Sequence, residues 1–287
     1  MNKIIRSTTE ALKYLYNLSL DRSSFVFRGQ ADYVWTLQPS IYRSFDYIRY
    51  QTSVYERYLL DHKPKIPNPP LTHTTYDMEW LMLCQHYEVP TRLLDWTTEI
   101  LIALFFTCSS EENLDKDGAL FICNQNDYPQ FTTYDKSAME TQELAFVNTY
   151  IVNPRMRMQS GSFMIWGHAP LDEETTESYD LWEYHKKIGG DLLLEKIRIP
   201  KDAKTSILQE LKDVYSISDD SLYIPDGFLE RTYAPTFKQF KENIRLMTIH
   251  TTNADSLTSE ENKLAESLFP FKCRNMYGNC TSLRMIK

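Results

Sequence analysis

Several features that would identify common protein classes are scarce or missing in this sequence. Glycine accounts for only 8 of the 287 residues, and no Walker loop, GxGxxG or GxSxG motif occurs. Ordinary P-loop nucleotide hydrolases, Rossmann folds and α/β-hydrolases therefore lack their defining residues. The five cysteines are widely spaced and include no C-x2-C pair, and no H-E-x-x-H motif exists. These absences argue against a zinc site.

The balance of charge and the lengths of the apolar runs exclude further classes. The net charge of −8 and the pI near 5.3 argue against broad electrostatic binding to nucleic acid or to an anionic membrane. No stretch approaches the ~20 apolar residues of a membrane-spanning helix, and the first residues lack the apolar run of a signal peptide. We expect a protein of the cytoplasm, from a bacterium.

The most hydrophobic part of the chain lies between residues 79 and 108. Residues 80–87 predict a helix that ends at Val89, because a residue before proline is pushed out of the α region. Residues 100–106 are seven consecutive apolar residues, which predicts a helix buried in the centre of the domain.

The polar segment between these two runs is expected to start the second helix. Asp95 or Thr97 could cap that helix, and Glu99 would lie in its first turn, where the helix dipole favours a negative charge. Arg92 and Trp96 would then be held at a helix N-terminus, which is a plausible place for a site.

The remaining chain predicts helices alternating with short strands. We expect an α+β fold in which helices pack on a small, strongly bent, mixed or antiparallel sheet, followed by a helical C-terminal region. A change of character near residue 230 divides the chain into a domain of residues 1–230 and an extension of residues 231–287. The expected helices are 8–20, 46–62, 143–152, 203–215 and 237–250; the expected extended segments are 24–27, 119–123, 155–166 with a bend at Ser160-Gly161, and 192–199; Thr258 and Glu261 form a capping box.

Four polar residues are candidates for chemistry, and each has an ordinary structural alternative. Arg28 ends a predicted strand and could clamp an anion with its forked donors, or could simply be ion-paired. His86 could be a structural histidine whose hydrogen bonds are made within the fold. Asp95 could be a helix cap, and Gln159 could be part of a turn. Their occurrence together in one sequence is what favours a site.

Long motifs in this sequence resemble the FRG domain. The resemblance covers roughly residues 20–230, and it departs from the family at Glu88, where glycine is usual, and after Asp226. The matching segments are Phe27-Arg28-Gly29-Gln30, Trp35-x-Leu37-x-Pro39-Ser40-x-x-Arg43, Gln85-His86-Tyr87-x-Val89-Pro90-Thr91-Arg92-Leu93-Leu94-Asp95-Trp96-Thr97, Ala103-Leu104-Phe105-Phe106, Asp117-Gly118-Ala119 and Gln159-x-Gly161-x-Phe163.

The first of these motifs is also similar to the aromatic-Arg-Gly triplet of arginine-type ADP-ribosyltransferases. That similarity implies NAD as the substrate, with Arg28 holding its phosphate and ribose oxygens and residues 159–163 cradling nicotinamide. A late acidic residue would contact the ribose, and Glu195, Asp226 and Glu230 are candidates for it.

Together the two resemblances imply a set of site residues and a setting. The protein would be an ADP-ribosyltransferase or NAD glycohydrolase of a toxin or phage-defence system, with a macromolecular acceptor or a protein partner. A non-catalytic domain that binds a nucleotide or a nucleic-acid end, or an interaction module, are the alternatives. The implied catalytic residues are Arg28, His86, Asp95 and Glu195, and the implied NAD-binding residues are Arg28, Gln30, Arg92, Trp96, Gln159 and Phe163.

Overall fold

The chain forms two compact units, residues 1–232 and 233–287. A computed structural model describes residues 3–18, 24–44, 56, 59–61, 77–132, 144–148, 154–166, 180–182, 193–225, 231, 234–243, 245–246 and 254–268. The first unit combines helices with a seven-stranded sheet, so the predicted α+β class is confirmed. The division of the chain into a domain of residues 1–230 and an extension of residues 231–287 stays a prediction.

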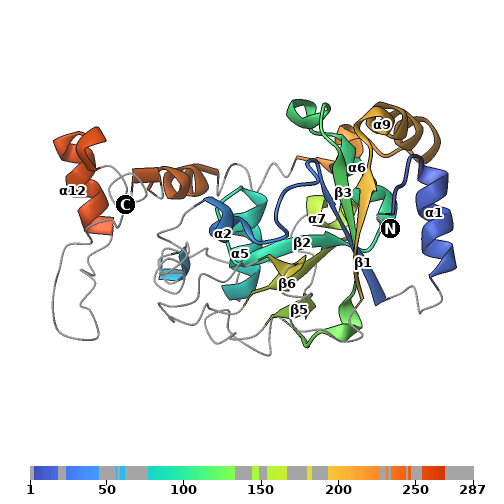
Figure 1. The fold of residues 1–287 in the computed structure, drawn as a ribbon. Helices are drawn as coiled ribbons and strands as arrows, with labels where there is room; N and C mark the ends of the chain where they lie inside the picture. Colours follow the sequence, from blue (N-terminus) through green and yellow to red (C-terminus); the bar gives the residue numbers. More distant parts are fainter. Residues whose placement is uncertain are drawn as a thin grey trace. The chain divides into compact units, whose positions relative to one another are not determined.

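The sheet runs through the whole first unit and is mixed. Adjacent strands are antiparallel except for the parallel pair β4–β5. Figure 1 shows β1, β3, β2, β6 and β5 within this unit. In spatial order the strands are β4 (Gln130–Thr132), β5 (Ala145–Asn148), β6 (Gly161–Ile165), β2 (Leu93–Thr97), β1 (Phe25–Gln30), β3 (Gly118–Asn124) and β7 (Leu194–Ile199).

One face of β1, β3 and β7 is buried under helices. Helix α6 (Ile100–Cys108) lies against β1 and β3, flanked by α1 (Thr8–Asn17) and α9 (Lys201–Tyr215). Because α6 is apolar on all sides, it must be enclosed, and the predicted buried central helix is confirmed. The shared core includes Phe27, Leu120, Ile122, Ile197, Ala103 and Ile207.

The sheet opens between β1 and β2. Strand β1 pairs with β3 along its whole length, from Phe25 to Gln30. With β2 it shares only the pair Phe27–Thr97. The two strands therefore diverge beyond this point, and the divergence leaves space for a cleft.

The segment before α6 differs from the expectation. Residues 93–97 form strand β2 rather than a helix start, so Asp95 is not a cap. Helix α6 begins at Ile100 with Glu99 at its N-cap, and no side chain caps it. Thr97 Oγ1 instead accepts a hydrogen bond from the Glu99 amide, at 3.1 Å. Pairing with β6, distant in sequence, overrides the local pattern here.

Two further elements were assigned the wrong type. The expected helix over residues 143–152 contains strand β5, which pairs with β6. The first expected extended piece contains α7 (Pro154–Met158), and the bend at Ser160 has a positive φ of 46°. Most of the expected helix 46–62 lies outside the described residues.

The described part of the second unit is helical. Residues 234–243 are helical, and α12 (Ser259–Leu268) follows the predicted capping box. Thr258 Oγ1 accepts from the Glu261 amide at 3.2 Å, and the Glu261 carboxylate accepts from the Thr258 amide at 2.9 Å. The capping box is thus confirmed. Among the described residues, no helix combines the length and apolar character required to cross a membrane.

Candidate functional site

A cleft of about 550 Å³ lies where β1 and β2 diverge. Its size is typical of small-molecule sites, which span roughly 300–1,000 Å³. Its lining comes from β1, β2 and β6, the loop after β1, α7, the end of α5 (Asp77–His86) and α10 (Asp219–Leu222). We call this space the cleft.

Arg28 spans the opening between the two diverging strands. Its side chain starts on β1, and Nη1 donates to the main-chain oxygen of Asp95 on β2, at 2.5 Å. Its Nε is buried and has no hydrogen-bond partner among the described residues. Burial, with a smaller contribution from the positive charge of Arg43, lowers the pKa of Arg28 to about 10. The guanidinium therefore remains charged at neutral pH and keeps a donor free.

A second arginine and a carboxylate lie close enough to interact electrostatically with Arg28. Arg43, on α2 (Ser40–Ser44), is fixed by a hydrogen bond from its Nε to the main-chain oxygen of Gln38, at 2.8 Å. The charges of Arg43 and Asp95 both act on Arg28. The Asp95 side chain is exposed in the cleft, and its Oδ2 accepts from Gln85 Nε2 at 2.8 Å. Arg28, Arg43 and the Asp95 carboxylate thus lie in the same cleft, which is also lined by Arg155, Glu88 and Asp219.

The two aromatic residues expected to bind NAD, Trp96 and Phe163, are buried. Trp96 is 3% exposed and its ring lies 6.2 Å from that of Phe146. Successive strand residues face opposite sides of a sheet, so this ring lies on the face opposite the side chain of Asp95. Phe163, paired with Asp95, is 6% exposed. Both residues line the cleft, but neither offers an open ring face.

The exposed rings of the cleft are Trp35 and Tyr223. Trp35, in the loop after β1, is 40% exposed, and Tyr223, directly after α10, is 38% exposed. The guanidinium of Arg155 lies 4.1 Å from the Tyr223 ring centroid, and Phe106 meets that ring edge to face at 6.4 Å. Tyr223 is thereby held in a fixed position while part of its ring remains accessible.

Three other predicted site residues also line the cleft. Gln30 donates from Nε2 to the Thr36 oxygen at 3.0 Å, and its buried Oε1 has no partner among the described residues. Gln159 donates from Nε2 to the Leu222 oxygen at 3.3 Å and so ties α10 to the cleft. His86 ends α5, with its ring edge to face with that of Tyr87.

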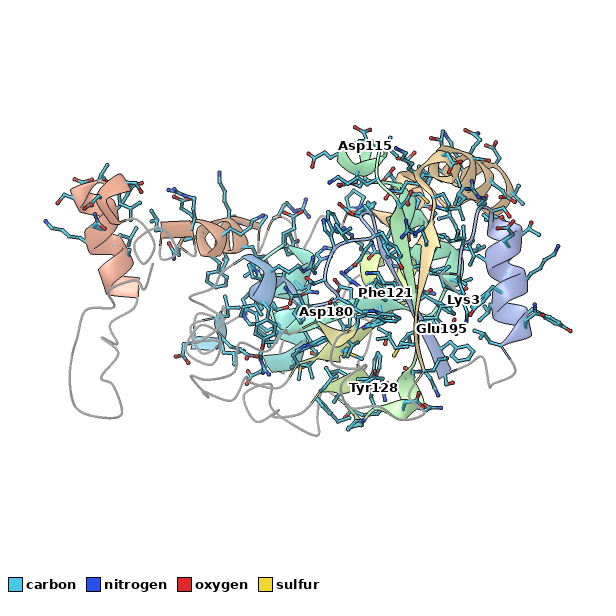
Figure 2. All side chains as sticks on the ribbon, in the orientation of Figure 1. Lys3, Asp115, Phe121, Tyr128, Asp180 and Glu195 are labelled. Atoms are coloured by element: carbon cyan, nitrogen blue, oxygen red, sulfur yellow. The ribbon has the colours of Figure 1, made fainter. Side chains whose placement is uncertain are left out.

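Glu195 is not part of the cleft. Arg28 on β1 aligns with Phe121 on β3 and through it with Lys196 on β7, whereas Glu195 aligns with Ile122. Arg28 and Glu195 therefore point to opposite faces of the sheet. The Glu195 carboxylate accepts hydrogen bonds from Tyr14 and from Lys3, the latter at 2.6 Å, and Figure 2 shows Lys3 beside it. The other two acidic candidates, at positions 226 and 230, lie outside the described residues.

Arg92 is also placed away from the cleft. Its side chain is 1% exposed and pairs with Glu56, with 2.6 Å between Nε and Oε2. Its Nη1 donates to the main-chain oxygen of Trp166. The structure thus assigns the Arg92 guanidinium to internal partners rather than to a ligand.

Neither thiols nor metal ligands contribute to the cleft. Cys84, Cys108 and Cys123 are free and buried. Burial raises the pKa of Cys108 to about 12, which disfavours the reactive thiolate. The described residues contain no group of three or more histidine, cysteine or acidic side chains arranged to hold a metal ion.

Sequence reasoning missed several cleft residues as candidates. Arg43, Trp35 and Gln85 lie inside the quoted motifs, so their position in those motifs was an available signal. Arg155 and Tyr223 lie in segments where the local sequence predicts only a strand piece and a turn. Their meeting depends on the packing of α10 near α7, which no local pattern reveals.

The turn after α5 accounts for one departure from the motif. Glu88 has a φ of 62°, in the left-handed region that glycine adopts without steric cost. The turn is therefore kept with a glutamate in place of glycine, and this residue lines the cleft.

Comparison with known proteins supports the assignment of these motifs. Neither the curated proteins nor the solved structures include a match. The FRG domain model matches residues 23–116. This range contains Arg28, Arg43, Gln85 and Asp95, whereas α7, β6 and α10 lie beyond it. This match identifies residues 23–116 as an FRG domain.

Proposed function

We propose that the cleft binds NAD and cleaves its nicotinamide–ribose bond, with ADP-ribose passing to a macromolecular acceptor or to water. The observation that carries this proposal is the convergence of Arg28 and Arg43 with the Asp95 carboxylate in one cleft. A dinucleotide presents a doubly negative pyrophosphate and, as nicotinamide leaves, a ribose that develops positive charge. The two arginines and the carboxylate match these two needs.

The arginines suit the pyrophosphate for geometric reasons. A guanidinium offers a rigid fork of N–H donors that fits phosphate oxygens. The unpartnered Nε of Arg28 is a donor that a ligand could satisfy after a small shift of the side chain. The flanking rings of Trp35 and Tyr223 would hold the two aromatic ends of the dinucleotide by stacking.

Asp95 takes the role of the acidic residue in this proposal. Its carboxylate is exposed in the cleft, next to the two arginines. A fixed negative charge near the ribose would stabilise the oxocarbenium-like transition state by preorganised electrostatics. Glu195, which does not line the cleft, is not used.

The test is nicotinamide release from NAD by the purified protein, with Arg28→Lys as the matched control. Lysine keeps the positive charge but loses the fork, so we expect release by the wild type and at least about a tenfold loss in the variant. Adding a cell lysate distinguishes the acceptors, because a macromolecular acceptor would make release depend on the lysate. Tight NAD binding without release would instead favour a binding domain. The absence of both NAD binding and nicotinamide release would overturn the proposal.

The setting of a toxin or phage-defence system follows from the same proposal. A protein that cleaves NAD depletes the cell that contains it. Expression of the wild type in bacteria should therefore slow growth and lower cellular NAD, and Arg28→Lys should do neither. Unchanged NAD in cells that contain soluble wild-type protein would contradict this role.

A further inference from the structure

A directional chain of hydrogen bonds ends on the carboxylate of Asp95. The main-chain amide of Leu93 donates to Thr91 Oγ1 at 3.2 Å. The Thr91 hydroxyl donates to Gln85 Oε1. Gln85 Nε2 then donates to Asp95 Oδ2 at 2.8 Å. The chain connects the turn before β2 with the end of α5 and with the cleft.

The direction of this chain is fixed at both ends. A main-chain N–H can only donate, so Thr91 Oγ1 accepts from Leu93 and its own hydrogen is left for Gln85. An ionised carboxylate can only accept, so Asp95 requires the NH₂ group of the Gln85 amide. The opposite amide orientation would place Gln85 Oε1 against the Asp95 oxygen and leave the buried Thr91 hydroxyl without an acceptor.

The chain restrains an exposed carboxylate that lines the cleft. An exposed aspartate on a strand would otherwise sample several rotamers. The Asp95 main-chain oxygen is simultaneously held by Arg28. Both the backbone and the side chain of Asp95 are therefore fixed, one from β1 and the other from α5.

We propose that Gln85 and Thr91 are positioning residues that hold the Asp95 carboxylate aimed at the ribose of the bound dinucleotide. This inference rests on the proposed function for its reaction, but the hydrogen-bond chain itself does not. Gln85 contacts Asp95 directly, whereas Thr91 acts through Gln85 by setting the orientation of its amide.

Three substitutions separate positioning from simple structural support. Thr91→Val keeps the shape and removes the hydroxyl, Thr91→Ser keeps the hydroxyl, and Gln85→Glu keeps the acceptor for Thr91 but removes the donor to Asp95. If the residues position Asp95, Thr91→Val and Gln85→Glu should lower kcat about tenfold or more with KM within about twofold. Thr91→Ser should restore kcat to near the wild-type value.

The three variants are compared by thermal unfolding, and the two Thr91 variants and Asp95→Asn are also compared by NMR of the Gln85 side-chain amide. We expect the amide signals to move in Thr91→Val and in Asp95→Asn, but not in Thr91→Ser. Equal kcat for the valine and serine variants, or losses that only follow the melting temperature, would overturn the positioning role. If the wild type releases no nicotinamide, the proposed function fails, and the Gln85 amide signals alone test the hydrogen-bond chain. Signals that move in the Thr91→Val protein but not in the Thr91→Ser protein support the chain. Signals that are unchanged in the Thr91→Val protein overturn it.

Discussion

The guanidinium of Arg92 and the carboxylate of Glu56 form a buried ion pair with two contacts. Nε lies 2.6 Å from Oε2 and Nη2 lies 3.1 Å from Oε1, and the two side chains are 1% and 3% exposed. Two charges removed from water in this way stabilise one another, and either one alone would be strongly disfavoured.

Removing one member of this pair should therefore destabilise the protein more than removing both. We expect Arg92→Met to lower the free energy of unfolding by about 3–5 kcal/mol, because the Glu56 charge is left buried without its partner. The double variant Arg92→Met with Glu56→Leu should recover most of that loss. Urea unfolding of the three proteins measures both effects, and a fully stable Arg92→Met protein that no longer binds NAD would instead restore the ligand role expected from sequence.

The exposed ring of Tyr223 should contribute to ligand binding rather than to stability. We expect Tyr223→Ala to weaken NAD or ADP-ribose binding by about 2- to 13-fold, which corresponds to the 0.5–1.5 kcal/mol of an aromatic contact. Tyr223→Phe retains the ring over Arg155 and should bind nearly as the wild type does. Isothermal titration calorimetry measures the affinity, and equal affinity of the alanine and phenylalanine variants would remove this ring from the site.

The parts of the fold that could be predicted are those with a strong local pattern. Residues 100–106 cannot expose an apolar run of that length, so their burial in α6 follows from composition. The helix α9 and the strand β7 likewise follow from spacing alone. Residues 93–97 offered no such signal, because only pairing with β6, about seventy residues later, makes them a strand.

The site was predictable as a group of motif residues but not as a geometry. Arg28, Gln30 and Asp95 meet in the cleft as the motifs suggested. Glu195 does not reach the cleft, because β3 separates its strand from β1 and its carboxylate accepts hydrogen bonds from Lys3 and Tyr14. The accessible rings could not be distinguished from buried ones such as Trp96, since exposure is set by tertiary packing.

Gly29 should be intolerant of any side chain. A Cβ built there would lie 2.0 Å from the Ala103 oxygen and 2.7 Å from the Thr107 amide nitrogen, both main-chain atoms of α6. Gly29→Ala must therefore push β1 away from α6, and we expect a loss of about 3 kcal/mol or more in the free energy of unfolding. The control is Gly161→Ala, whose nearest contact would be a flexible methionine side chain, that of Met156, at 3.2 Å. Urea unfolding of both variants is the measurement, and similar losses at the two positions would contradict the close approach of β1 and α6.

Asp117 should make stability depend on acid pH. Its Oδ1 accepts from the Lys201 amide and its Oδ2 from Arg198 Nη1, each at 2.9 Å. The Lys201 amide, and then Arg198, lower the pKa of Asp117 below its ordinary value of 3.8. A carboxyl whose pKa is lower in the folded than in the unfolded chain stabilises the fold above the unfolded value, and the contribution disappears as the pH falls through the folded value.

Asp117→Asn should accordingly cost stability at neutral pH and little in strong acid. We expect a loss of about 1 kcal/mol at pH 7, modest because the pair is partly exposed to solvent. The difference from the wild type should shrink as the pH falls below about 4, where Asp117 of the unfolded chain becomes protonated first and Asp117 of the folded chain follows at lower pH. Asp202→Asn is the control: its pair with Arg6 is 54% and 66% exposed, so it should change stability by less than about 0.5 kcal/mol at any pH. Urea unfolding at pH 7 and pH 3 decides the matter, since a constant gap between the Asp117→Asn protein and the wild type would show that the lost stability does not come from the charge of Asp117.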